Sequence, residues 1–344
     1  MTQQELVDRF KVYVAHRLPE ARKIEIGQVN PIFGGASRET VSMELKYVLR
    51  GNPSSQRVIL RREFESGIVE TSVRTEYQAY HAFGNTDVPV PKVIWTEEDP
   101  KWLNTPFYVM EEILGCQALH VVFSAPPYDA IRERVGETFF RIMGAIAASD
   151  PAAIGLQDKL EAVRPEDCWK RELDYWEADA KRNELEPQPV LCAAIRWLRR
   201  NPPPPAQRVV VVHGDMRAGN FLFNENGQIR AILDWEMMHM GDPLEDLAWS
   251  MNRLWTWSEP HLIGFMVPRE RGIRIWEETA GFRADRKALF WWEVFTSVKS
   301  MAIWMSMNRT YDTGANTDPI IGYGGIWAMD LQRRILMEQM RRAS

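Results

Sequence analysis

The sequence predicts an α+β protein of two lobes, in which a small antiparallel sheet with one main helix precedes a larger, mainly helical part. A length of 344 residues suits about two domains or one large two-lobed unit. Period-2 hydrophobic patterns occupy the first third of the chain, and long amphipathic segments follow Gly115. We therefore expect an N-terminal lobe over residues 1–113 and a C-terminal lobe over residues 114–344.

The composition is that of a globular protein, with 45% hydrophobic and 26% charged residues. A formal net charge of -5 argues against a nucleic-acid or membrane partner, since both attract clustered positive charge. The three cysteines, Cys116, Cys168 and Cys192, fit neither a disulfide framework nor a paired zinc motif. No segment approaches about 18 consecutive apolar residues. We expect a soluble cytoplasmic protein with reduced thiols.

Alternating or β-branched apolar residues predict the strands of the first lobe, at residues 41–46, 57–62, 92–96 and 107–112. A charged turn over residues 97–100 separates the last two strands. Between Glu70 and Phe83, apolar residues recur every three or four positions, which is helical spacing. The first lobe is thus expected to be a sheet with a single helix.

The second lobe begins with an amphipathic segment from Asp129 to Ala148, whose apolar residues follow helical spacing. Short strands interrupt the helical pattern later in the chain, at residues 209–212, 221–223 and 229–233. Asn226 and Gly227 lie between the last two strands, and an Asn-Gly pair marks a hairpin. We expect a small β-hairpin inside an otherwise helical lobe.

A polar pattern around this hairpin points to phosphoryl transfer. Asp215 and Asn220 stand in a D-x-x-x-x-N pattern, and Asp234 follows a predicted strand 14 residues later. This chemistry needs a carboxylate that accepts the proton of an attacking hydroxyl, which suits Asp215, and oxygen ligands for Mg²⁺, which suit Asn220 and Asp234. Arg217 either offsets charge on the transferred group or is an ordinary surface arginine. Polar residues also collect at loop ends for turn geometry, but the fixed order of this set favours catalysis.

The chain resembles the aminoglycoside phosphotransferase-like family, the small-molecule branch of the protein-kinase-like fold, in the segments HGDMRAGNFLF, ILDWE and GDPLEDLAW. It is especially similar to members related to the kinase-like domains found with acyl-CoA dehydrogenases. The resemblance covers most of the chain and implies a bilobal protein-kinase-like fold that uses ATP and Mg²⁺. It also implies that Asp246 bonds the backbone of the loop around Asp215, and that His213 packs and forms hydrogen bonds there instead of acting as a base.

The segment FGGASRET, residues 33–40, joins two expected strands and resembles the phosphate-covering loop of that family. Small residues such as Gly34, Gly35 and Ser37 let backbone N–H groups approach phosphate oxygens. An ordinary hairpin turn is the alternative interpretation of a Gly-Gly pair. The chain has no G-x-x-x-x-G-K-[ST] motif, which disfavours the P-loop class of nucleotide-binding proteins.

Two further segments of the first lobe resemble the nucleotide site of kinases. The strand V-I-L-R ends at Arg61, where protein kinases place a phosphate-binding lysine, and Glu76 on the following helix is its expected partner. Arginine offers a planar fork instead of a point charge, and the alternative is that Arg61 is an exposed edge charge. Residues 107–113 resemble the segment between the lobes, which implies a hinge at about 109–113 whose backbone near Glu111 and Ile113 bonds the adenine edge.

The acceptor is expected to bind the helical lobe. Tryptophans are concentrated there and either line an apolar pocket or pack the core, which is the more common role: Trp249, Trp255, Trp257, Trp276, Trp291, Trp292, Trp304 and Trp327. From Met251 to Ser344, Lys and Arg exceed Asp and Glu by three, which favours a neutral or anionic acceptor. We expect an ATP- and Mg²⁺-dependent phosphotransferase acting on a small-molecule hydroxyl, by analogy a hydroxyacyl compound or its CoA ester. The alternatives are an aminoglycoside, macrolide or amino-alcohol kinase, and a nucleotide-binding protein without turnover.

Overall fold

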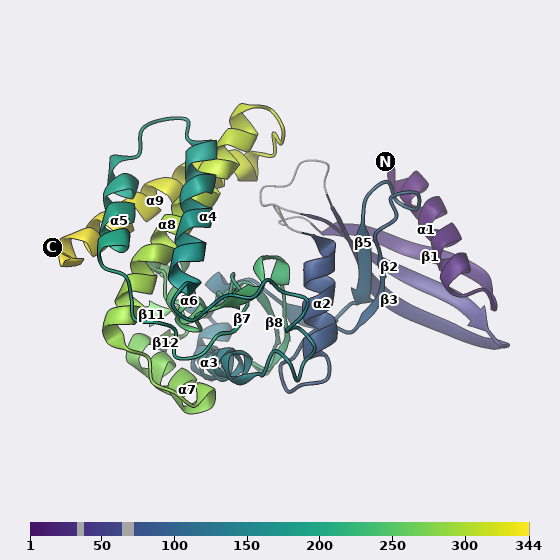
Figure 1. The fold of residues 1–344 in the computed structure, drawn as a ribbon. Coiled ribbons are helices and arrows are strands. Elements are labelled where there is room, and N and C mark those ends of the chain that lie inside the picture. Colours follow the sequence, from purple (N-terminus) through teal and green to yellow (C-terminus); the bar gives the residue numbers. More distant parts are fainter. Residues whose placement is uncertain (33–37, 64–71, 344) are drawn as a thin grey trace.

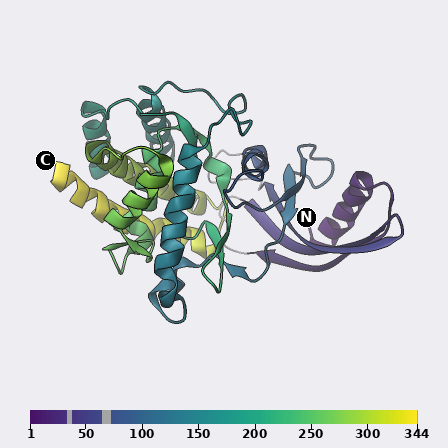
Figure 2. The same ribbon diagram turned by 90° about the horizontal axis from the view of Figure 1, so that it is seen from below.

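A computed structural model describes residues 1–32, 38–63 and 72–343, without the side chain of Ile320. A five-stranded antiparallel sheet in the order β1-β2-β3-β5-β4 lies beside a larger helical lobe (Figure 1). The N-terminus lies at the sheet end of the molecule and the C-terminus at the opposite end, as Figures 1 and 2 both show. The predicted α+β fold with a small sheet lobe and a larger helical lobe is confirmed.

The sheet consists of β1 Ala21–Ile32, β2 Arg38–Leu49, β3 Asn52–Glu63, β4 Val93–Glu97 and β5 Phe107–Glu111. The last four confirm the predicted strands. β1 has no counterpart among them, because it is an edge strand in which only Ala21 and Ile24 are buried and bulges interrupt the register with β2. Such a strand lacks the regular alternation that marks a half-buried one.

Helix α1, Gln3–Arg17, also belongs to the sheet lobe, so the expectation of a single helix there is wrong. Its buried residues Leu6, Phe10, Tyr13 and Val14 recur at helical spacing and pack against the sheet. This spacing, although it covers few residues, is the signal that predicts the helix.

The two faces of β3 contact different parts of the molecule. Val58 and Leu60 pack in a cluster with Phe10 of α1. Ile59 belongs instead to the large cluster that fills the helical lobe. Because side chains alternate along a strand, Arg61 lies on the same face as Ile59 and is directed towards the helical lobe.

Helix α2, Val73–Phe83, confirms the predicted helix and joins the sheet to the helical lobe. The ring of Phe83 stacks on Trp235, with 4.6 Å between centroids. The hydroxyl oxygen of Tyr80 accepts a hydrogen bond from the backbone N–H of Asp234 at 3.2 Å. The core of the helical lobe therefore extends into α2, and it fixes α2 beside the segment that contains Asp234.

The helical lobe contains α3 Arg132–Ala148, α4 Cys168–Asn183, α5 Pro189–Arg200, α6 Leu244–Ser250, α7 Arg269–Ala280, α8 Arg286–Asp312 and α9 Pro319–Ala343. Helix α3 confirms the amphipathic segment. The short strands of the helical lobe are β6 Cys116–Gln117, β7 Val210–Val212, β8 Phe221–Asn224, β9 Ile229–Ile232, β10 His239–Gly241, β11 Leu262–Ile263 and β12 Val267–Pro268. Its 3₁₀ turns are η1 His120–Ser124, η2 Tyr128–Ala130, η3 Trp235–Met237 and η4 Arg253–Thr256. Strands β8 and β9 form the predicted hairpin, and β7 pairs with β10.

Most tryptophans of the helical lobe are core residues, which agrees with the packing interpretation: Trp249, Trp255, Trp276, Trp291 and Trp292 are buried. Trp257 and Trp327 are exposed and contact each other edge to face at 5.6 Å. All three cysteines are free thiols. Within the described ranges, the helices are too short or too polar to cross a membrane.

Candidate active site

The loop between β7 and β8 holds the carboxylate of Asp215 in a defined orientation. Oδ2 accepts a hydrogen bond from Asn220 Nδ2 at 2.6 Å, and Oδ1 accepts bonds from Trp249 Nε1 at 2.7 Å and Arg217 Nε at 3.1 Å. Burial raises the pKa of Asp215, while the charge of Arg217 and these donors act against the increase. The structure thus brings Asp215, Arg217 and Asn220 together, with Trp249 of α6 as an additional donor.

The buried side chain of Asp246 binds the backbone of His213 and Gly214. Asp246 of α6 accepts hydrogen bonds from the N–H groups of His213 at 2.7 Å and Gly214 at 2.9 Å. Burial raises the pKa of Asp246 to about 6, against the effect of these bonds. Gly214 has φ +85°, and a Cβ there would lie 2.4 Å from the carbonyl oxygen of Met237, so only glycine fits. Asp246 therefore fixes the backbone that leads into Asp215.

Both ring nitrogens of His213 form hydrogen bonds inside the protein. Nε2 lies 2.9 Å from the carbonyl oxygen of Leu233, and Nδ1 accepts a bond from the N–H of Asp215 at 3.1 Å. Burial lowers the pKa of His213 to about 4, so the ring is neutral at pH 7. These contacts assign the proton to Nε2 and leave neither nitrogen for proton exchange with a substrate.

Asn220 and Asp234 lie next to each other because the β8–β9 hairpin returns the chain to its starting point. The N–H of Leu233 donates to the carbonyl oxygen of Asn220 at 2.8 Å. Asp234 has φ 66° and ψ 53°, a left-handed conformation that sets its carboxylate apart from the strand. Among the described residues, none donates a hydrogen bond to Oδ1 of Asn220 or Oδ2 of Asp234. Two available oxygen atoms of this type suit Mg²⁺.

Arg61 of β3 contacts both α2 and Asp234, the candidate Mg²⁺ ligand. Its Nη1 lies 3.0 Å from Glu76 Oε1 and its Nη2 lies 2.9 Å from Asp234 Oδ1. Glu76 is fully buried and also contacts Arg38, with 2.8 Å between Oε2 and Nε. Burial raises the pKa of Glu76 despite both arginines. Burial also opposes ionisation of Asp234, but Arg61 outweighs it and holds the pKa below its usual range. With 8% exposure, Arg61 is not an exposed edge charge.

The expected hinge residues lie at the end of β5. The N–H of Glu111 donates to the carbonyl oxygen of Lys92 at 2.9 Å. The neighbouring Glu112 side chain accepts bonds from Arg57 at 2.6 Å and from Ser42 at 2.8 Å. Glu111, Glu112 and Ile113 line a cavity of about 1080 Å³, together with residues 114–116 and with residues of the segments 84–90 and 224–230. Neither Asp215 nor Asp234 lines this cavity, so it is distinct from the site around residues 213–220, the predicted catalytic loop between β7 and β8.

Three predicted residues of the phosphate-covering loop, Gly34, Gly35 and Ser37, lie outside the described residues. Their role stays a prediction.

Three side chains in this region have no place in the predicted site, namely Arg38, Trp249 and Lys299. Arg38 lies next to the glycine-rich segment, and its partner Glu76 belongs to a distant helix. Trp249 follows Asp246 by three residues in the segment GDPLEDLAW, so it shares a face of α6 with Asp246. Lys299 is a cation within the mostly buried first half of α8, and a buried charge is a signal for a specific partner.

A sheet of this order, a buried Arg–Glu pair between sheet and helix, and a loop that positions Asp215 and Asn220 define the class of kinase-like small-molecule phosphotransferases. The sequence profile of the phosphotransferase enzyme family matches residues 40–282, so the chain belongs to this family. The relatives include mouse acyl-CoA dehydrogenase family member 10, which is 26% identical over 201 residues, and rat acyl-CoA dehydrogenase family member 11, which is 25% identical over 296 residues. The matches cover 57% and 82% of this chain but only 18% and 37% of those relatives. The chain thus spans well under half of their length.

Solved structures support the same fold. A protein of Ralstonia eutropha JMP134, provisionally named an aminoglycoside phosphotransferase, superposes with a TM-score of 0.72 at 21% identity over 98% of both chains. A thermostable mutant of aminoglycoside phosphotransferase APH(4)-Ia, bound to ADP and hygromycin B, gives 0.60 at 14% identity over 96% of this chain and 97% of that one. The GDP and kanamycin complex of APH(2″)-IIIa gives 0.61 at 13% identity over 97% and 98%. At these identities the likeness extends to the fold alone.

Proposed function

We propose that this chain transfers the γ-phosphate of ATP to a hydroxyl group of a small molecule, with Asp215 as the catalytic base. The observation that carries the proposal is the carboxylate of Asp215, oriented by N–H donors of Asn220, Arg217 and Trp249. A carboxylate in a fixed direction can align an acceptor hydroxyl and take its proton as the new O–P bond forms. Its raised pKa favours proton acceptance, because it brings the basicity closer to neutral pH.

Arg217 is proposed to stabilise charge on the transferred phosphoryl group. Its Nε is bonded to Asp215, and its Cζ lies 4.7 Å from the centroid of the Trp255 ring, which keeps the guanidinium beside the reacting position. A quarter of the side chain is exposed, so its remaining donors can reach a ligand. An arginine on this loop therefore acts without a large conformational change.

The nucleotide is proposed to lie between the lobes, with its phosphates near Arg61. Glu76 holds Arg61 by an ion pair on the face of the sheet directed towards the helical lobe. The backbone at Glu111 and Ile113 is proposed to bond the adenine edge. With ATP present, Asn220 and Asp234 would hold Mg²⁺, which neutralises phosphate charge and makes the terminal phosphorus more electrophilic. The loop with Gly34, Gly35 and Ser37 is proposed to cover the phosphates.

For the acceptor, we favour a neutral or anionic hydroxyacyl compound, either free or as its CoA ester. The names of the long relatives, which combine related sequence with acyl-CoA dehydrogenases, support this class. A cavity of about 510 Å³ beside β10 offers aromatic rings from Tyr175 and Trp176 together with the cation Arg171. Lys299 also lines it, but its ammonium group is already bonded to Gly214 and Glu245. Glu161, Glu172 and Glu236 also line it, so it is not a purely cationic site.

An aminoglycoside, a macrolide or an amino alcohol is the second candidate acceptor. Structures of similar fold contain hygromycin B or kanamycin, which supports this possibility. The excess of three positive charges from Met251 to Ser344 is unfavourable for a polycationic acceptor. The three free thiols are compatible with a cytoplasmic location, which we propose as well.

The test is ADP release from Mg-ATP with a panel of hydroxyacyl-CoAs, hydroxy acids, aminoglycosides, macrolides and amino alcohols. Asp215→Asn is the blank, because it keeps the shape of the side chain and removes the base. Turnover above this blank with one class identifies both the reaction and the acceptor. Turnover of Asp215→Asn equal to wild type would refute the role of Asp215.

A thermal-shift experiment separates nucleotide binding from transfer. Mg-ATP should stabilise wild type and Asp215→Asn, while Asp234→Ala should lose the Mg²⁺-dependent part of the shift. An identical shift for Asp234→Ala would contradict its metal-binding role. Binding without turnover on any acceptor would favour a nucleotide-binding protein without catalysis.

A further inference from the structure

Lys299 places a charged side chain in the interior of the helical lobe. It lies in α8, where the residues from Ala288 to Ala302 are mostly buried, and its own side chain is 1% exposed. An ammonium group in such a place is strongly unfavourable unless it is paired and hydrogen-bonded. Its partners therefore identify what the residue does.

The ammonium group contacts four residues from three parts of the lobe. Nζ donates to the carbonyl oxygen of Gly214 at 2.7 Å and to Glu245 Oε1 at 3.0 Å. It also lies 4.9 Å from the ring centroid of Trp249 and 5.4 Å from that of Trp176. The two oxygen partners lie in the catalytic loop and α6, so one side chain of α8 binds both.

With the contact from Lys299, both backbone polar groups of Gly214 are hydrogen-bonded to buried side chains. The N–H of Gly214 is bonded to Asp246, and its carbonyl oxygen is bonded to Lys299. The next residue is Asp215, whose carboxylate accepts a bond from Trp249, the ring that also faces the ammonium group. Lys299 thus contacts the carbonyl group that precedes Asp215 and one of the three donors to its carboxylate.

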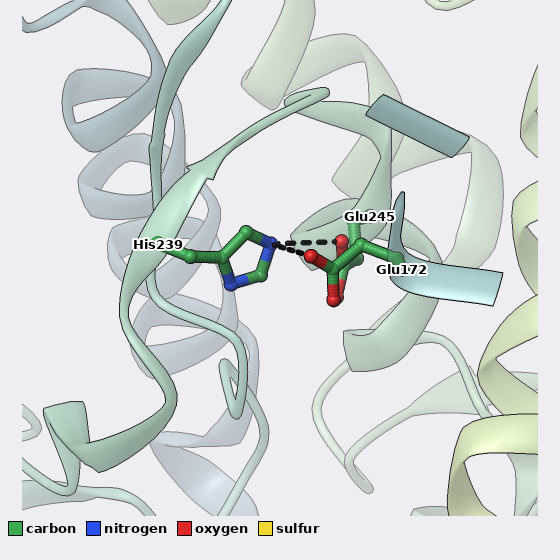
Figure 3. Close-up of side chains that lie close together, drawn as sticks. All are labelled: Glu172, His239 and Glu245. Atoms are coloured by element: carbon green, nitrogen blue, oxygen red, sulfur yellow. Dashed lines mark hydrogen bonds and ion pairs between the residues drawn. The ribbon is translucent and has the colours of Figure 1, made fainter. Parts of the chain in front are cut away.

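Glu245 itself belongs to a cluster of three side chains, with Glu172 and His239 (Figure 3). His239 Nε2 points to both carboxylates of this cluster and lies 3.2 Å from Glu245 Oε2 and 3.5 Å from Glu172 Oε1 (Figure 3). The three side chains are close enough to share a cation. The ammonium group of Lys299 already occupies the other oxygen of Glu245, so the cluster anchors this lysine and its charges are compensated.

We propose that Lys299 is a positioning residue for phosphoryl transfer, which holds the Gly214 carbonyl and thereby the orientation of Asp215. This inference rests on the proposed function of Asp215. Its contacts lie with the backbone before Asp215, with Glu245 and with two tryptophan rings, and not with the proposed nucleotide or metal ligands. The expected effect of Lys299 is therefore on the rate of transfer and not on nucleotide binding.

The experiment compares Lys299→Met with the matched control Lys287→Met, which changes an exposed lysine at the start of the same helix. Each protein is titrated with Mg-ATP to determine the number of sites and Kd, and ADP release is measured with the pooled acceptor panel. We expect Lys299→Met to lose at least tenfold in kcat per nucleotide site, with Kd for Mg-ATP within about twofold of wild type. Lys287→Met should retain wild-type values.

A double variant, Lys299→Met/Glu245→Gln, removes both charges of the pair and so avoids an uncompensated buried carboxylate if the single variant does not fold. It still lacks the donor to Gly214, and we expect the same loss in kcat. The inference is overturned if kcat per site stays within twofold of wild type, or if kcat falls only in proportion to the number of sites. If wild type is no more active than Asp215→Asn, the proposed function is overturned, and the inference with it. If wild type is active and the Lys299 variants are equally active, only the inference is overturned.

Discussion

Replacing Trp249 by phenylalanine isolates one hydrogen bond to the proposed base. The indole N–H donates to Asp215 Oδ1 at 2.7 Å, and the Trp249 side chain is buried at 2% exposure. Phenylalanine retains an aromatic ring beside Trp255, which lies 5.5 Å from the indole, and removes only the donor and part of the ring area. The change therefore tests the orientation and acidity of Asp215 with limited damage to the core.

The expected magnitude follows from the charge of the acceptor. A hydrogen bond to an ionised group contributes about 1.5–3 kcal/mol, so its loss corresponds to about ten- to hundredfold in rate where ionised Asp215 limits turnover. Burial raises the pKa of Asp215 and the Trp249 N–H lowers it. Removing this donor raises the pKa further, because the bond stabilises the charged form. The acid limb of the kcat–pH profile of Trp249→Phe should thus move to higher pH.

The assay is ADP release from Mg-ATP over pH 5 to 9 with the best acceptor of the panel. Trp276→Phe is the matched control, since Trp276 is fully buried in α7 and its Nε1 has no hydrogen-bond partner in the described structure. We expect this control to keep the wild-type pH profile even where its stability falls. A Trp249→Phe profile that superposes on wild type would refute the reasoning, because the indole N–H would then have no effect on the base.

Two further predictions concern charged contacts of the site. Burial alone would lower the pKa of His239, but the carboxylates of Glu172 and Glu245 outweigh it and raise the pKa to about 9. The resulting stabilisation, on the order of 3 kcal/mol, is complete below a pH of about 6.5 and lost as the pH rises through about 9. Urea unfolding should therefore separate wild type from His239→Gln most at pH 6 and least above pH 9, and a constant difference would contradict this. Arg61→Lys should raise the Kd for Mg-ATP at least severalfold, because one ammonium group cannot reproduce the planar guanidinium that spans Glu76 and Asp234. Calorimetric titration measures this Kd, and a wild-type value would show that the guanidinium is not needed.

Elements with a marked apolar pattern are predicted from the sequence, and these include the edge strand β4, whereas α1 and β1 are missed. The apolar residues that predict β2, β3 and α2 are largely buried, and they alternate in β2, form a short continuous run in β3 and follow helical spacing in α2. Helix α1 shows helical spacing at only four buried residues, and strand β1 buries only Ala21 and Ile24, so each gives a weak local signal. Their formation depends largely on the sheet against which they pack.

The same distinction applies to the candidate site. Asn220 and Asp234 are close in the chain and are brought together by a hairpin that the Asn-Gly pair predicts, so their proximity follows from local structure. The bond from Trp249 to Asp215 spans 34 residues, and the bond from Lys299 to Gly214 spans 85. Such contacts depend on how α6 and α8 pack around the catalytic loop. No spacing in the sequence expresses this packing, and only the isolated charge of Lys299 marks it.

Charged contacts reinforce the packing between the sheet and the helical lobe on the nucleotide side of the site. Tyr80 and Phe83 of α2 pack in the large core cluster of the helical lobe, which also includes Ile59 of β3. Arg61 belongs to the sheet, and its two Nη groups bind Glu76 of α2 and Asp234 of the helical lobe. One planar guanidinium therefore fixes the sheet relative to both elements at the point where the phosphates are expected. A lysine provides one charge centre and would leave one of these carboxylates without its partner, so arginine at this position couples the placement of the sheet to the geometry of the proposed metal site.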